Sequence, residues 1–162
     1  MKLKIIVLTA ILSLAGIFAQ AQNLPDVKLQ DARGRTVSTS SLMDGKTPVV
    51  VTFWSTTCKY CIDEIDALGE ALENHPELKC RVVCISVDDS RSLARAKAMA
   101  STRDWDAFTL LYDTNKALYR NLNVVNIPQM FIYGKDGRQI YSHTGYSAGD
   151  ELKTIKIIAE NQ

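Results

Sequence analysis

The feature that most constrains this chain is a run in which a strand pattern changes to a helix pattern around two cysteines. Residues 49–54, VVVTFW, are apolar and β-branched, which is the composition of a buried strand. Cys58 and Cys61 then stand where this strand leads into the first turn of a helix. Helix N-terminal N–H groups and the helix dipole favour a thiolate at Cys58, and Cys61 is near enough to form a disulfide with it. The helix is indicated by apolar residues three or four apart, at Ile62, Ile65, Leu68 and Leu72.

The rest of the chain alternates strand patterns with helix patterns. After a lead-in of short strands, the predicted order is β-α-β-α-β-α-β-β-α. This order favours one α/β domain with a mostly parallel central sheet and a closing antiparallel hairpin. Strands are predicted at about 27–29, 37, 49–54, 80–87, 109–112, 129–133 and 138–143, and helices at about 62–74, 90–99, 113–122 and 150–160.

Residues 1–21 have the pattern of a signal peptide. They begin with two lysines, continue with an apolar run that is too short to span a bilayer comfortably, and end in Ala-Gln-Ala, the small-x-small form of a signal-peptidase site. We therefore expect cleavage before Gln22, a mature domain of residues 22–162, and a periplasmic location. An uncleaved membrane anchor is the alternative.

The charge balance argues against nucleic acid as a partner. The whole chain has 19 basic and 18 acidic residues, and loss of the two N-terminal lysines leaves 17 and 18, a net charge of −1. Proteins that bind nucleic acid through its phosphates normally carry a basic excess. All four cysteines lie in the mature part, and exposed thiols do not stay free by accident in an oxidising compartment.

Four short motifs of the chain resemble the thioredoxin fold. They are Phe53-Trp54, Cys58-x-x-Cys61 at a strand-to-helix junction, Ile127-Pro128 before a strand, and Gly145 after the hairpin. With the export signal and an added helix and strand between about residues 88 and 114, the chain looks like the TlpA/ResA group of extracytoplasmic thiol–disulfide oxidoreductases. The resemblance covers about residues 24–162. It implies a thioredoxin fold, in which helices flank a central mixed sheet, with an N-terminal β lead-in and an αβ insertion.

The resemblance also implies roles for the matching residues. Cys58 would be the exposed nucleophile that attacks a substrate disulfide, and Cys61 would be the more buried thiol that resolves the mixed disulfide. Pro128 would be cis and lie beside the cysteine pair, which leaves the backbone of Ile127 available to a substrate strand. The Cys58–Cys61 disulfide would be the redox group, with no other cofactor and no metal.

The acid–base group is expected to be Glu64. Thioredoxins place a buried aspartate six residues before the first cysteine, but this chain has Thr52 there, and Thr57 replaces the tryptophan that many relatives carry before that cysteine. Glu64 matches a glutamate that ResA-like proteins use for this purpose. Its i,i+3 spacing places it on the Cys61 side of the helix, where it would accept the proton of Cys61. An ordinary acidic residue in a first helical turn is the alternative.

The predicted substrate-binding set surrounds the cysteine pair. A lysine charge at position 59 would lower the pKa of Cys58 if it lay beside that thiol. The tyrosine at position 60 would shape the rim, and the tryptophan at position 54 would lie in the core or flank the site. The set comprises Trp54, Lys59, Tyr60, Ile127 and Pro128.

The remaining cysteines and the histidines are interpreted as structural. The spacing of Cys80 and Cys84 from the first pair superficially resembles that of zinc ligands, but the two lie in an apolar strand pattern. Four positions apart on a strand they would be about 13 Å apart, which is too far for a disulfide. His75 and His143 have no ligand-like partner nearby in the sequence.

The sequence therefore predicts an exported thiol–disulfide oxidoreductase. The resemblance favours a reductase of exported proteins that bear disulfides or thiols, kept reduced by a membrane electron donor. A thioredoxin-fold peroxidase is one alternative, although Val51 and Ser55 stand where the motif Pro-x-x-x-Thr-x-x-Cys has proline and threonine. A non-catalytic binding module with a structural disulfide is the other.

Overall fold

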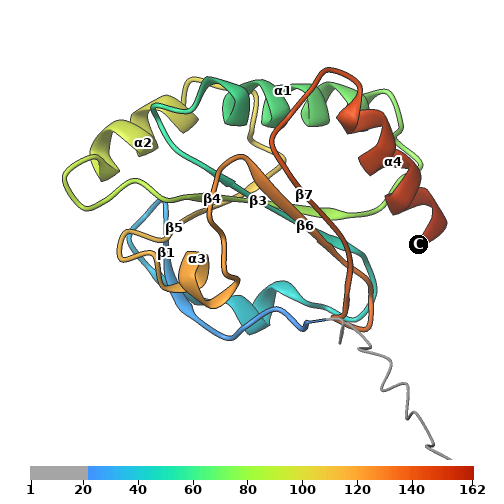
Figure 1. Cartoon of the computed structure of the whole chain (residues 1–162), viewed down its shortest axis with the longest axis horizontal. Helices are drawn as coiled ribbons and strands as arrows, with labels where there is room; N and C mark the ends of the chain where they lie inside the picture. Colours follow the sequence, from blue (N-terminus) through green and yellow to red (C-terminus); the bar gives the residue numbers. More distant parts are fainter. Residues whose placement is uncertain (1–21) are drawn as a thin grey trace, which may run out of the picture.

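A computed structural model describes residues 22–162, in which helices cover both faces of one seven-stranded mixed sheet (Figure 1). The predicted signal peptide, residues 1–21, lies outside the described residues. No helix within the described part is long and apolar enough to cross a membrane. The elements are β1 Lys28–Asp31, β2 Thr36–Ser38, the 3-10 helix η1 Thr39–Leu42, β3 Val49–Trp54, α1 Lys59–Glu73, β4 Arg81–Ser86, α2 Leu93–Ala100, β5 Thr109–Tyr112, α3 Ala117–Asn121, β6 Gln129–Tyr133, β7 Gln139–Thr144 and α4 Asp150–Glu160.

The strand order is β2-β1-β5-β4-β3-β6-β7. The three central strands, β5, β4 and β3, pair in parallel, because α1 and α2 provide the crossovers between them. β6 and β7 add an antiparallel hairpin beside β3, and β1 joins the lead-in antiparallel to β5. The predicted mixed sheet, closing hairpin, β lead-in and inserted α2–β5 unit are therefore confirmed. The sheet is not mostly parallel, however, because the lead-in and the hairpin make four of its six strand pairings antiparallel.

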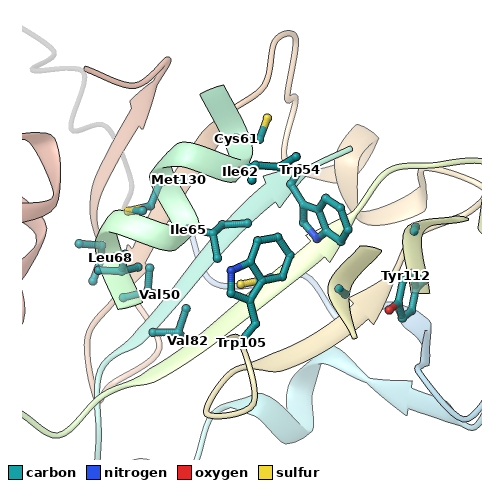
Figure 2. Close-up of a cluster of buried hydrophobic side chains, with 14 of the residues drawn as sticks. Val50, Trp54, Cys61, Ile62, Ile65, Leu68, Val82, Trp105, Tyr112 and Met130 are labelled. Carbon is teal, nitrogen blue, oxygen red and sulfur yellow. The ribbon is translucent and has the colours of Figure 1, made fainter. Parts of the chain in front are cut away.

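β3 supplies both hydrophobic cores, because its side chains alternate between the faces of the sheet. Val50 and Trp54 enter the cluster that includes residues of α1, α2 and α4, whereas Val51 and Phe53 enter the cluster on the α3 face. Figure 2 shows the first cluster, in which Trp54 packs edge-to-face on Trp105 with 5.1 Å between ring centroids. Burying a large apolar side chain stabilises a fold by roughly 1.5–3 kcal/mol. Since all of β3 is buried, it forms a rigid base for the cysteine loop.

Some element boundaries differ from the predicted ones. Cys80 precedes β4 instead of opening it. α2 has Ser92 at its N-cap, and that side chain makes no capping hydrogen bond, so Ser90 does not cap the helix. α3 begins at Ala117 and not at residue 113 as predicted, although the buried carboxylate of Asp113 accepts the N–H groups of Ala117 and Tyr119 at 2.7 and 2.9 Å.

Candidate active site

A disulfide closes the first turn of α1. Cys58 is the N-cap residue of this helix, its Sγ accepts the N–H of Cys61 at 3.2 Å, and the two cysteines are bonded with 5.3 Å between their Cα atoms. Cys58 is half-buried, whereas Cys61 has 0% of its surface exposed. A substrate can therefore reach the first sulfur only. The free N–H groups at the start of the helix favour negative charge on that sulfur.

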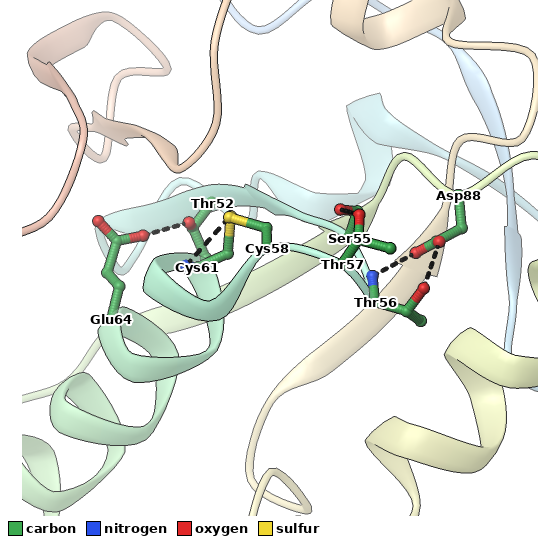
Figure 3. The surroundings of a disulfide bond; sticks show 8 residues. All are labelled: Thr52, Ser55, Thr56, Thr57, Cys58, Cys61, Glu64 and Asp88. Carbon is green, nitrogen blue, oxygen red and sulfur yellow. Dashed lines mark hydrogen bonds between the residues drawn. A yellow bond between two sulfur atoms is a disulfide. The ribbon is translucent and has the colours of Figure 1, made fainter.

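A buried carboxylate holds the loop that precedes Cys58. Asp88, which follows β4, accepts the N–H of Thr56 at 2.9 Å and its hydroxyl at 2.8 Å. It also accepts the hydroxyl of Ser86 at 2.9 Å. The N–H of Cys58 donates to the carbonyl of Ser55 at 3.1 Å, so the loop turns directly into the helix (Figure 3). These bonds set the position of the first sulfur relative to the sheet.

A second buried carboxylate lies on the other side of the disulfide (Figure 3). Glu64 follows Cys61 by three residues on α1 and is 2% exposed. Its Oε2 accepts the hydroxyl of Thr52 at 2.6 Å, and its Oε1 lies 2.9 Å from Nε2 of His143. Glu64 is therefore a buried carboxylate, three residues after the buried cysteine, with a polar partner at each oxygen.

The register of four strands explains why these groups meet. Thr52 on β3 pairs with Cys84 on β4 and with Met130 on β6, and Met130 pairs with His143 on β7. Directly paired residues point to the same face of a sheet, so the four side chains form a row on the α1 face. Since neighbouring strands are about 4.8 Å apart, Thr52 and His143 are separated by roughly 10 Å. Glu64 spans that separation from the helix above.

The Ile127–Pro128 peptide bond is cis. Ile127 is half-buried and Pro128 is buried. Ile127 lines an open groove of about 530 Å³ that also reaches Thr57, the neighbour of Cys58. We call this the Ile127 groove. Its other walls come from α2, α3 and the loop before β6, and its exposed members include Arg95, Lys116 and Val125.

Three residues of the predicted substrate-binding set lie in different environments. Tyr60 is 64% exposed next to the disulfide and is available as its rim. Lys59 is exposed, but its ammonium pairs with Asp63 at 2.5 Å, and the hydrogen bond to Asp63 raises the pKa of Lys59. Its charge is thus directed along the helix and not toward Cys58. Trp54 is 1% exposed, so it is a core residue and its assignment to the substrate-binding set is wrong.

The other two cysteines are free thiols. Burial raises the pKa of Cys80 to about 11, and burial together with the negative charge of Glu64 raises the pKa of Cys84. Both thiols are therefore poor nucleophiles at neutral pH. Within residues 22–162, no group of three or more His, Cys, Asp or Glu side chains is placed to hold a metal ion. The zinc alternative thus has no ligand set in this part of the chain.

Two site residues were missed by sequence reasoning. His143 was interpreted as structural, but its Nε2 lies against Glu64. The alternation of β7 was the available signal, because it places Tyr141 and His143 on one face, where their rings are 5.5 Å apart. Asp88 gave no such signal, since an acidic residue after a strand is common in turns.

Comparisons with known proteins agree with this geometry. The AhpC/TSA family matches residues 21–141. The thioredoxin-like protein YneN of Bacillus subtilis (strain 168) is 30% identical over 136 residues, which cover 83% of this chain and 76% of YneN. The thiol-disulfide oxidoreductase ResA of Bacillus thuringiensis subsp. konkukian is 22% identical over 130 residues, which cover 80% of this chain and 72% of that protein.

A solved structure extends the comparison to three dimensions. An uncharacterized thioredoxin-like protein from Porphyromonas gingivalis is 33% identical to this chain and superposes with a TM-score of 0.73 over 87% of this chain and 92% of its own. The predicted thioredoxin fold is thus confirmed. On its matched residues and on its fold, with a bonded CxxC pair at the start of α1, the chain belongs to the AhpC/TSA family of thioredoxin-like proteins, among whose members are thiol–disulfide oxidoreductases.

Proposed function

We propose that this protein is an exported reductase of protein disulfides that works through Cys58 and Cys61. The observation that carries the proposal is the asymmetry of the pair. One sulfur is accessible at a helix N-terminus, and the other is fully buried, three residues before the buried carboxylate of Glu64. A static structural bridge needs neither feature, whereas two-step thiol–disulfide exchange uses both.

In the first step, the Cys58 thiolate of the reduced protein attacks one sulfur of a substrate disulfide. A bond forms between Cys58 Sγ and that sulfur, the substrate S–S bond breaks, and the second substrate sulfur leaves as a thiolate that takes a proton from water. The start of α1 stabilises the thiolate that attacks. The product is a mixed disulfide between protein and substrate.

In the second step, Cys61 releases the substrate. The Cys61 thiol gives its proton to Glu64, and the resulting thiolate attacks Cys58 Sγ. The Cys58–Cys61 bond forms as the mixed disulfide breaks, so two electrons have passed from the protein to the substrate. The bonded pair described above corresponds to this oxidised product. A dithiol donor must then reduce the pair, and the resemblance to the TlpA/ResA group favours a donor in the membrane.

The Ile127 groove favours a polypeptide as the substrate. It passes from Thr57, the neighbour of Cys58, to Ile127, so an extended chain lying in it would meet the backbone of Ile127 close to the cysteine loop. Arg95 and Lys116 are exposed on its walls. Asp88 and Asp89 also line the groove, so its walls carry both signs of charge and do not by themselves select an acidic or a basic substrate.

Export is the part of the proposal supported by residues 1–21. An extracytoplasmic location would bring the protein into contact with disulfide-bearing partners. Sequencing the N-terminus of the mature protein from an extracytoplasmic fraction tests this directly. We expect a chain that begins at Gln22, and an uncleaved chain in the membrane fraction would contradict it.

Turnover of a disulfide-bonded protein tests the proposed activity. Cys58→Ser should abolish reduction, while the matched variant Cys80→Ser should leave turnover unchanged because burial keeps that thiol protonated. Cys61→Ser should trap the mixed disulfide, and mass spectrometry of the trapped complex would identify the partner. Full turnover by Cys58→Ser would exclude the proposed mechanism.

Peroxide is a less suitable substrate for this site. Val51, at the proline position of the peroxidase motif, is buried within β3, and the hydroxyl of Ser55, at the threonine position, lies 3.2 Å from that of Thr57. Consumption of hydrogen peroxide by the same variants separates the two activities. Peroxide turnover faster than disulfide turnover would favour the peroxidase alternative.

A further inference from the structure

We propose that His143 is a positioning residue that holds Glu64 in its ionised, proton-accepting form. This inference rests on the proposed function, because it concerns the step in which Glu64 takes the proton of Cys61. His143 comes from β7, at the far end of the chain from α1, and reaches Glu64 only through the strand register. The interaction therefore depends on the complete fold.

Each oxygen of Glu64 has its own polar partner. The hydroxyl of Thr52 donates to Oε2 at 2.6 Å, and Nε2 of His143 lies 2.9 Å from Oε1. An ionised carboxylate at 2% exposure is costly unless its oxygens accept hydrogen bonds. A neutral imidazole that carries its proton on Nε2 supplies the second donor. Glu64 is thus held as an acceptor with both oxygens satisfied.

The second imidazole nitrogen identifies this tautomer. Nδ1 of His143 is buried and has no hydrogen-bond partner among residues 22–162. An imidazolium would place an N–H donor at Nδ1 with no acceptor, which disfavours the charged ring. The neutral ring with its proton on Nε2 leaves only a lone pair unmatched. The geometry therefore points to a fixed donor and not to a ring that carries protons.

The surroundings of the His143 ring also favour a neutral imidazole that donates to Glu64. The narrow cleft shared by Glu64 and His143 has no room for a water molecule. Asp150 of α4 also lines this cleft, but its carboxylate accepts the N–H of Ser147. Cys84 of β4 also faces Glu64, and burial together with the negative charge of Glu64 raises the pKa of that thiol. On α4, Glu151 is hydrogen-bonded to the Tyr146 hydroxyl, and Lys153 lies over the ring of Tyr141, a neighbour of His143 on β7.

In the step in which Cys61 displaces the substrate, every proton is accounted for without a proton leaving His143. The proton of the Cys61 thiol moves to Glu64, which becomes neutral, and the Cys61 thiolate attacks Cys58 Sγ. The departing substrate thiolate takes a proton from water, and Glu64 returns its proton to water after the substrate has left. His143 keeps its Nε2 proton throughout and acts only through the ionisation and orientation of Glu64.

A two-phase reaction separates this inference from the proposed function. When reduced protein is mixed with dithiobis(nitrobenzoate), attack by Cys58 releases one coloured thiolate, and resolution by Cys61 releases a second. A missing first phase would exclude Cys58 as the nucleophile. A normal first phase with a changed second phase reports on the resolving step, in which Glu64 and His143 are proposed to act.

Two substitutions of His143 differ in whether they keep the donor. His143→Gln places an amide N–H near the position of Nε2, whereas His143→Asn is too short to reach Glu64. We expect the second phase to slow about tenfold in His143→Asn and to stay within about threefold of wild type in His143→Gln. The pH at half-maximal rate should rise in His143→Asn, because a carboxylate that loses a donor is harder to ionise. Ser142→Ala, at an exposed neighbour on β7, is the matched control.

Two results would overturn the proposal. One is a second phase of His143→Asn that equals wild type in rate and pH profile. The other is a His143→Gln variant that is as slow as His143→Asn at an unchanged melting temperature, because that would require titration of the imidazole itself. If His143→Asn does not fold, the pH profile of His143→Gln decides: an unchanged midpoint supports a positioning donor, and a moved midpoint excludes it.

Discussion

Two buried carboxylates flank the redox disulfide, and they differ in the groups that they bind. Asp88 accepts a backbone N–H and the side chain of the same loop residue, together with a hydroxyl of β4. Glu64 bonds to side chains only, and one of these is an imidazole. Asp88 therefore fixes the backbone before Cys58, while Glu64 can change its protonation without displacing the main chain. Both carboxylates are buried, so it is their hydrogen-bond partners that distinguish a structural role for Asp88 from the acid–base role proposed for Glu64.

The largest effect that separates the two carboxylates should come from Glu64→Gln. This change keeps the shape of the side chain but removes the proton acceptor, so resolution by Cys61 should slow by about 100-fold or more. The second phase with dithiobis(nitrobenzoate) measures it. Glu70→Gln, at an exposed position of the same helix, is the control. A second phase within twofold of wild type would break the comparison, since Glu64 would then be as purely structural as Asp88.

Asp88→Asn should affect stability more than proton transfer. Loss of charge-assisted hydrogen bonds to the Thr56 loop should lower the free energy of unfolding by about 1.5–3 kcal/mol. Urea denaturation measures this change, and the pH at half-maximal second phase should not move. Asp106→Asn, at an exposed loop position, provides the reference. A shifted pH profile with unchanged stability would reverse the roles assigned to the two carboxylates.

Thr52→Val should sharpen the description of Glu64. Valine has nearly the shape of threonine but cannot donate to Oε2, so the second phase should slow about tenfold. Thr154→Val is a suitable control, because that buried hydroxyl contacts the Met130 sulfur instead of Glu64. Equal effects of the two substitutions would mean that the Thr52 hydroxyl contributes only to packing.

The smallest effect is expected for Lys59→Ala. The Lys59 ammonium is exposed and paired with Asp63, so its removal should change the first phase by less than about twofold. Measurements at low and high salt test this expectation. A strong, salt-dependent loss of the first phase would show that Lys59 acts on the Cys58 thiolate, as the sequence suggested.

Much of the fold could be predicted from the sequence because its signals are local. The buried composition of residues 49–54 and the helical spacing after Cys61 each depend on neighbours along the chain, and the structure has a strand and a helix there. Glu64 was selected mainly through the resemblance to ResA-like proteins, because an acidic residue one turn after Cys61 is by itself a weak signal. Trp54 was misassigned because its burial depends on packing against Trp105, which is far away in the sequence.

The contact between Glu64 and His143 could not be predicted, because it depends on long-range register. The register of the hairpin shifts between Ile132 and Tyr133. Counting residues outward from the turn therefore does not give the pairing of Met130 with His143. A shift of one residue would move His143 to the other face of the sheet. The contact of Asp88 with the cysteine loop likewise depends on the parallel pairing of β3 and β4, because this pairing brings the end of β4 beside the loop.

The reduction potential of the Cys58–Cys61 disulfide tests the central claim most directly. Equilibration of the purified protein with defined dithiol–disulfide buffers, followed by counting of free thiols, gives this value. A redox-active pair should have a potential above about −300 mV and exchange with small thiols. A potential well below that value would identify an inert structural bridge and contradict the proposed function.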